Sequence, residues 1–187
     1  FAALLLARSG FRPLVLERGP ELDERVKAVE HFEKTGELNL NANIQFGEGG
    51  AGTFSDGKLT TRVGDPLCAF VTDAFLQHGA PADIAWRQKP HVGTDLLRGI
   101  IRSIRQEIIA LGGEVRFNTA LTGLKIENGA LASVETTAGD FACEQLILAV
   151  GHSARDTFAM LHQAGVPMEQ KPFAVGVRIE HRQSDIN

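Results

Sequence analysis

The densest group of potential binding residues is a glycine-rich stretch, Gly47 to Lys58, in the first third of the chain. Glycine lets backbone N–H groups approach an anion closely, because no Cβ stands in the way. The hydroxyls of Thr53 and Ser55 and the ammonium of Lys58 could add hydrogen bonds to phosphate or other ligand oxygens. The pattern therefore predicts an anion-binding loop, with a plain surface connector as the alternative.

Three known glycine signatures overlap in this stretch, and none fits its surroundings. Gly47, Gly49 and Gly52 spell G-x-G-x-x-G, but the flanking residues indicate neither a preceding strand nor a following helix. Gly52 to Lys58 spells the start of a P-loop, yet Leu59 occupies the position of the magnesium-binding Ser or Thr. A protein kinase is excluded, because H-R-D and D-F-G are absent from the sequence. A nucleotide-triphosphate-binding protein that uses Gly52 to Lys58 remains the alternative enzyme class.

Glu17 is the second candidate, because it ends the apolar run that begins at Pro13. Such a run is typical of a parallel strand buried on both faces. In a nucleotide-binding βαβ unit, an acid at the end of the second strand accepts hydrogen bonds from a ribose hydroxyl, about 20 residues after the glycine signature. This spacing predicts a G-x-G-x-x-G sequence just upstream of Phe1, so we expect the chain to be an internal fragment. A solvated carboxylate at a strand end is the alternative.

The third candidate is the apolar run Gln145 to Val150, which leads into Gly151, His152 and Ser153. In an open α/β sheet, ligands lie at the carboxyl ends of the strands. Gly151 would then allow close approach of a ligand, and His152 or Ser153 would line the site. An ordinary strand-to-helix turn with Ser153 as the N-cap is the alternative.

Hydrophobic periodicity and turn residues predict the elements that position these groups. Helices are expected over residues 1–9, 21–34, 65–78, 94–111 and 154–163. Strands are expected over residues 13–17, 114–118, 121–127, 130–137, 145–150 and 173–180, with a two-residue turn at Asn128-Gly129. The order predicts an α/β fold: an incomplete Rossmann-like domain with parallel strands, an inserted helical region and a small antiparallel β-meander. We expect this domain over residues 1–165, with the cofactor loop at 46–59 and the β layer at 114–144, and a second segment beginning at 166–187.

Composition excludes several function classes. The 187 residues are 43% hydrophobic and carry a net charge of −4 without a basic tract, which argues against nucleic-acid binding. No apolar run approaches the length of a membrane-spanning helix. The histidines show no metal-ligand spacing. Cys68 and Cys143 form neither a C-x-x-C motif nor a disulfide framework, so we expect a cytoplasmic setting.

Three segments together, Leu14 to Gly19, Gln45 to Leu59 and Leu146 to Ser153, resemble bacterial FAD-dependent dehydrogenases with the glutathione-reductase-like two-domain flavoprotein fold. The resemblance implies an FAD-binding domain in which Glu17 binds the adenosine ribose and Leu121 meets adenine through its backbone. It also implies that Gly49 to Ser55 wraps the pyrophosphate and ribityl side of FAD, and that Gly151 lies near FAD. The cofactor-binding residues expected are Glu17, Arg18, Gly49, Gly50, Gly52, Thr53, Ser55, Lys58, Leu121, Gly151 and His152.

The resemblance further implies an oxidoreductase that transfers hydride or electrons through the flavin to or from a small-molecule substrate, with NAD(P)H as a candidate electron donor. It identifies neither the substrate nor a general acid or base. Without a cysteine pair near the flavin, the chain departs from the disulfide reductases of this fold. A truncated chain that keeps the fold without a cofactor is the non-enzymatic alternative.

Overall fold

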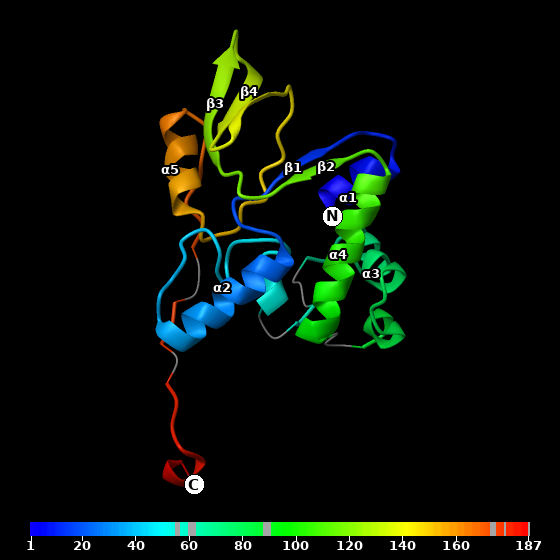
Figure 1. Cartoon of the computed structure of the whole chain (residues 1–187), viewed down its shortest axis with the longest axis vertical. Coiled ribbons are helices and arrows are strands. Elements are labelled where there is room, and N and C mark those ends of the chain that lie inside the picture. Colours follow the sequence, from blue (N-terminus) through cyan, green and yellow to red (C-terminus); the bar gives the residue numbers. More distant parts are fainter. Residues whose placement is uncertain (55–56, 60–62, 88–90, 173–174, 178, 187) are drawn as a thin grey trace.

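A parallel pair of short strands lies beside the helical part of the molecule (Figure 1). The computed structural model describes residues 1–187 except 55–56, 60–62, 88–90, 173–174, 178 and 187. β1 (Leu14–Leu16) pairs in parallel with β2 (Glu114–Arg116), and Val15 lies opposite Val115. β1 follows α1 (Ala2–Arg8), and β2 follows α4 (Thr94–Ala110), which contacts both α1 and β2. The predicted α/β fold with a parallel pair is confirmed.

The core forms around α4, because its apolar residues recur every three or four positions on one face. Leu97, Ile100, Ile104 and Ile108 are all buried there. They belong to one cluster with residues of α1, of α3 (Cys68–Gln77) and of the segments that flank α3. The predicted helix 94–111 thus exists almost to the residue, and it forms the support against which the glycine-rich loop folds.

Two further helices follow their predicted positions closely. α2 (Leu22–Thr35) ends at Gly36, whose φ of 78° is the left-handed conformation of a C-cap glycine. α3 begins later than the predicted helix 65–78, because the Asp65 carboxylate accepts a hydrogen bond from the Leu67 N–H in a turn that precedes the helix. Short 3-10 helices lie at η1 (Ala51–Phe54), η2 (Ala82–Ala85) and η3 (Gln183–Asp185).

A separate antiparallel sheet follows β2 and carries α5 on one side (Figure 1). Its strands are β3 (Leu121–Glu127), β4 (Ala130–Thr136) and β5 (Gly139–Ala142), in the order β3-β4-β5. Asn128 and Gly129 connect β3 to β4 with φ values of 52° and 79°, as a type I′ turn requires. This confirms the predicted hairpin, and α5 (Arg155–Gln163) confirms the predicted helix 154–163.

Two predicted strands are wrong in this structure. Residues 145–150 form no strand and pair with none among the described residues, and Ile147 and Leu148 are exposed. An apolar run forms a strand only where a neighbouring strand edge accepts its hydrogen bonds, and the described part of the chain offers it none. The described residues of 173–180 form no strand either, and Val175, Val177 and Ile179 are exposed. The rest of that prediction lies outside the described residues.

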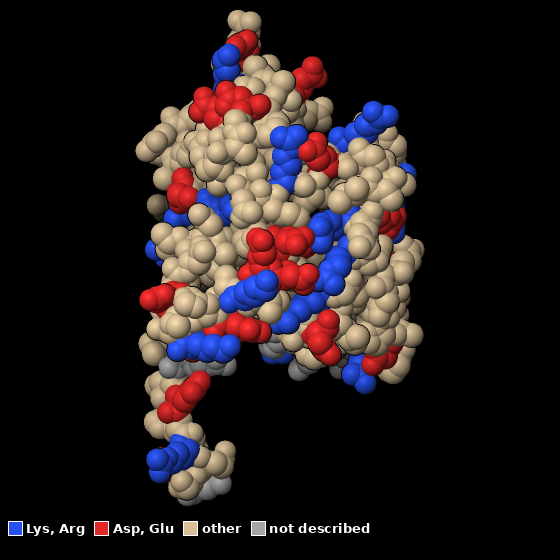
Figure 2. Space-filling model, in the orientation of Figure 1, with Lys and Arg blue, Asp and Glu red and all other residues tan. Residues whose placement is uncertain are grey.

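The charged surface matches the mixed composition. Figure 2 shows acidic and basic side chains interleaved across the displayed face, without a broad patch of either sign. No helix within the described residues is long and apolar enough to cross a membrane. Both cysteines are free thiols.

Candidate functional site

Glu17 links the end of β1 to the glycine-rich loop. Its Oε1 accepts one hydrogen bond from the Gly19 N–H at 2.9 Å and another from the Gly47 N–H at 3.1 Å. A Cβ on Gly19 would lie 2.5 Å from the Gly47 Cα and from the Asn41 carbonyl oxygen, so glycine is required at position 19. The Oε2 atom of Glu17 has no hydrogen-bond partner among the described residues. The carboxylate is therefore held by the loop through one oxygen.

Arg25, on α2, binds the backbone of the segment that leads into the glycine-rich loop. The sequence patterns did not single this residue out. This α2 side chain is completely buried, and its guanidinium donates hydrogen bonds to four carbonyl oxygens of one loop. The acceptors are Asn43 at 2.9 Å, Ile44 at 2.9 Å, Gly47 at 3.2 Å and Glu48 at 2.6 Å. Burial lowers the pKa of Arg25 to about 10, so the side chain is charged at neutral pH.

Gly47 makes room for that arginine. A Cβ on Gly47 would lie 2.4 Å from the Arg25 Cδ, and the φ of Gly47 is +116°. The first glycine of the apparent G-x-G-x-x-G is thus needed for packing against α2. A strand and a helix do not flank it, in agreement with the expectation that this signature is not a dinucleotide fingerprint.

Glu48 is a second residue that the motif analysis missed. Its Oε2 accepts a hydrogen bond from the Leu22 N–H at 2.9 Å, at the first turn of α2, where a carboxylate is favoured. Its Oε1 forms an ion pair with the Arg105 Nε of α4 at 2.7 Å. Glu48 is buried, so this one side chain ties the loop to two helices. A single acid between two glycines of the run, Gly47 and Gly49, is the sequence signal that could have identified it.

The next part of the loop contains the predicted residues Gly49, Gly50, Gly52 and Thr53. Gly49 and Gly50 have φ values of +87° and +67°, a region that L side chains rarely adopt. A Cβ on Gly49 would lie 2.2 Å from the Thr53 Oγ1. Thr53 itself is completely buried, and its Oγ1 has no hydrogen-bond partner in the described structure. An unpaired buried hydroxyl is costly, so it is a candidate contact for a ligand.

Arg18 brings the start of α5 to the end of β1. Its guanidinium lies 4.6 Å from the centroid of the Phe46 ring and donates a hydrogen bond to the Asp156 carboxylate at 2.6 Å. This hydrogen bond lowers the pKa of Asp156. Gly151 and His152 precede α5 and are both exposed, and Gly151 has a φ of +72°. The Arg18–Asp156 contact therefore joins the first turn of α5, which follows Gly151 and His152, to the residue after Glu17.

The segment before β3 also lies against β1. The Thr119 N–H donates to the Glu17 carbonyl oxygen at 2.9 Å, and the Asn118 N–H donates to that of Gly19 at 2.9 Å. Leu121, the predicted adenine contact, begins β3 two residues later. The backbone at Leu121 is thereby brought near the end of β1.

One predicted residue, Lys58, does not join this group. Lys58 forms an antiparallel bridge with His91 and lines a different pocket, which is formed mainly by α3 and the segment before it. Ser55 lies outside the described residues. Because α3 begins at Cys68, the sequence from Gly52 to Lys58 does not lead into a helix as a P-loop does. Over the described part of the chain, no cluster of His, Cys, Asp and Glu could hold a metal ion.

Comparison with known proteins gives a fold but no family. No protein-family profile matches the chain. A protein of Clostridium beijerinckii described as "Uncharacterized protein" is 54% identical over 187 residues, which are 100% of this chain and 35% of that protein. The chain thus spans about a third of the length of this relative.

Among solved structures, glycine oxidase from Bacillus cereus is similar, with a TM-score of 0.51 and 12% identity over 88% of this chain and 56% of that one. L-amino acid deaminase from Proteus myxofaciens has a TM-score of 0.43 at 15% identity, over 89% of this chain and 45% of that one. The amino acid oxidase NikD has a TM-score of 0.41 at 16% identity, over 87% of this chain and 50% of that one. Of these three structures, only glycine oxidase has a TM-score above 0.5. At 12% identity, this similarity indicates a shared fold and does not show a shared function.

Proposed function

We propose that this chain is part of an FAD-dependent oxidoreductase and supplies half of its FAD site. The observation that carries the proposal is the junction of Glu17 with the glycine-rich loop: one carboxylate oxygen binds the loop backbone and the other faces no described partner. An acid at this strand end fits a ribose hydroxyl. The fold shared with glycine oxidase, a protein named for oxidase activity, supports the same class of function.

The residues present fit the cofactor in two further respects. The orphaned Thr53 hydroxyl can donate to a phosphate or ribityl oxygen, which would satisfy it. Gly50, with a φ of +67°, has no heavy atom within 4 Å of the position that its Cβ would take, so the backbone there is open to a ligand. Glu17 would hold the adenosine ribose, Gly49 to Thr53 the pyrophosphate and ribityl side, and the Leu121 backbone the adenine edge. Bound there, FAD would supply hydride or electron transfer.

The chain's own residues would position the cofactor. Arg25 and Glu48 fix the loop on α2 and α4, while Arg18 holds the start of α5, with Gly151 and His152, toward the same site. The substrate, the role of NAD(P)H as electron donor and the cytoplasmic location remain predictions from the sequence. The described geometry favours no triphosphate site at Gly52 to Lys58.

The test is flavin binding by the full-length gene product. We expect the purified protein to show visible flavin absorbance, or to gain thermal stability when FAD is added. Glu17→Gln keeps the acceptor for the loop N–H groups but removes the charge, so it should weaken FAD binding about tenfold, the loss of roughly 1.4 kcal/mol from a charge-assisted hydrogen bond. Glu24→Gln, an exposed position on α2, is the matched control.

Two outcomes would contradict the proposal. A colourless protein that melts cooperatively and does not respond to FAD would favour the cofactor-free alternative. A thermal shift with Mg-ATP but none with FAD would favour the triphosphate-binding alternative. Equal FAD affinity of the Glu17→Gln and Glu24→Gln variants would remove Glu17 from the site while leaving the class of cofactor intact.

A further inference from the structure

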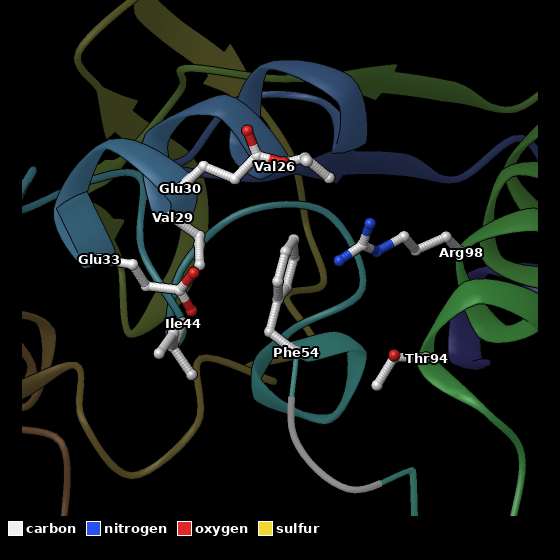
Figure 3. Close-up of a pocket in the computed structure, with 8 residues that line it drawn as sticks. All are labelled: Val26, Val29, Glu30, Glu33, Ile44, Phe54, Thr94 and Arg98. Atoms are coloured by element: carbon white, nitrogen blue, oxygen red, sulfur yellow. The ribbon is translucent and has the colours of Figure 1, made fainter.

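A second pocket opens between α2, η1 and the N-terminal end of α4 (Figure 3). Its volume is about 220 Å³, the space of about seven water molecules, which limits an occupant to a small molecule. The lining combines apolar and charged side chains: Val26, Val29, Glu30, Glu33, Ile44, Phe54, Thr94 and Arg98. Except for Phe54, which lies in the predicted cofactor loop, none of these residues was singled out for chemistry by the sequence motifs.

Phe54 lines this pocket, and two arginines contact its ring. Its ring lies 4.5 Å from the Arg25 guanidinium carbon and 4.8 Å from that of Arg98. Two cations on one ring hold its orientation, since each is attracted to the aromatic face. Val29 and Ile44 give the pocket an apolar wall beside the ring (Figure 3). An aliphatic chain would find contact surface there.

The two ends of the pocket carry opposite charges. Glu30 and Glu33 come from successive positions of one α2 face, three residues apart. Lys34 reaches Glu30 only at 4.0 Å, and Glu33 has no ion pair within the described structure. Arg98 comes from α4 on the other side, and Figure 3 shows the Phe54 ring between Arg98 and the two glutamates.

Arg98 is also incompletely paired. No carboxylate among the described residues forms an ion pair with it, and its guanidinium lies against the Phe54 ring that lines the pocket. Thr94, at the start of the 17-residue helix α4, lines the same end of the pocket. A helix N-terminus and a guanidinium both favour an anion, and a carboxylate can accept two hydrogen bonds from an arginine. The α4 end of the pocket therefore selects a carboxylate, and the α2 end selects an ammonium.

We infer that this pocket binds a small ω-amino acid, with its carboxylate at Arg98, its ammonium at Glu30 and Glu33, and its aliphatic chain along Val29, Ile44 and Phe54. An α-amino acid carries both charges next to one carbon, whereas the Phe54 ring lies between the two charged ends of this pocket (Figure 3). A dicarboxylate would leave the glutamates facing an anion, and a diamine would place a cation at Arg98. The inference concerns binding alone and holds whether or not the neighbouring loop binds FAD.

The experiment is isothermal titration calorimetry of the full-length gene product with a series of defined probes. The ω-amino acids are β-alanine, γ-aminobutyrate, δ-aminovalerate and ε-aminocaproate; the comparison compounds are alanine, glutarate and cadaverine. We expect one ω-amino acid to bind at least about tenfold more tightly than all three comparison compounds, a difference of roughly 1.4 kcal/mol. Equal binding of alanine or cadaverine, or no saturable heat with any ω-amino acid, would overturn the inference.

Variants then test the assigned ends. Glu33 is exposed, so the Glu33→Gln variant should fold normally. Its affinity for the tightest-binding ω-amino acid should be about tenfold weaker. The control variant Glu24→Gln, on the same helix, should bind that compound with unchanged affinity. Arg98→Met should reduce binding further. If Arg98→Met fails to fold, the comparison of Glu33→Gln with Glu24→Gln still decides, because equal affinities of these two variants would refute the site.

Discussion

Replacing Arg25 with methionine should destabilise the protein far more than replacing an exposed arginine. Methionine retains the apolar stem but removes the guanidinium, which leaves the carbonyl oxygens of Asn43, Ile44, Gly47 and Glu48 without their donor. At about 1 kcal/mol for each lost partner, the cost is about 4 kcal/mol. In a chain of this size, that should lower the melting temperature by about 8–16 °C.

The assay is urea and thermal denaturation followed by circular dichroism, with Arg102→Met as the matched control. Arg102 lies on α4 and forms an ion pair with Asp23, but its side chain is 41% exposed, so its loss should cost under about 1 kcal/mol. Arg25→Lys should fall between the two variants, because lysine keeps the charge but not the planar set of donors. If Arg25→Met is no less stable than Arg102→Met, the loop does not depend on Arg25 and the reasoning fails.

Two other perturbations follow from the packing of α4 and of the loop. Glu107 accepts hydrogen bonds from Arg8 at 2.7 and 2.8 Å, and this contact lowers its pKa. Because the folded pKa lies below the unfolded one, the pair stabilises the protein above the unfolded pKa of about 4.3, and this contribution is lost as the pH falls through the folded value. Urea midpoints measured down to strongly acidic pH should therefore fall more steeply for the native chain than for Glu107→Gln; parallel curves would exclude this contribution. Gly49→Ala should lower stability by about 1–3 kcal/mol, because the new Cβ meets the Thr53 Oγ1 at 2.2 Å and the Ile101 Cδ1 at 2.6 Å. Gly52→Ala, which meets no atom within 4 Å, is its control in thermal melts, and equal losses would show that the loop can relax around Gly49.

The elements that the sequence predicted well are those specified by nearby residues. The helix 94–111 was predicted because its apolar face is set by the spacing of Leu97, Ile100, Ile104 and Ile108, which no distant residue needs to supply. The Asn128-Gly129 turn was predicted because both residues tolerate a positive φ. Local patterns of this kind predict an element correctly because its formation does not depend on which distant residues pack against it.

The features that the sequence did not reveal depend on residues far apart in the chain. Arg25 reads as one more charge on a polar helix, and only the return of residues 43–48 across α2 turns it into a buried donor. The run 145–150 has the composition of a buried strand, but a strand also needs a neighbouring edge, which composition does not report. Glu17 was chosen by its position after a strand and does contact the glycine-rich loop, whereas Lys58 was chosen by residue type and lines a different pocket.

Because Arg25 binds four carbonyl oxygens of the loop, the loop loses its conformational freedom when the chain folds and not when a ligand binds. Ordering a residue's backbone costs about 1–2 kcal/mol in entropy, and for residues 43–48 this cost falls on the folding of the chain. A ligand that meets these residues finds them preorganised and does not have to order them. If a substitution removed the Arg25 hydrogen bonds, the entropy cost of ordering the loop would fall on ligand binding. Affinity would then weaken even for a ligand that does not contact Arg25.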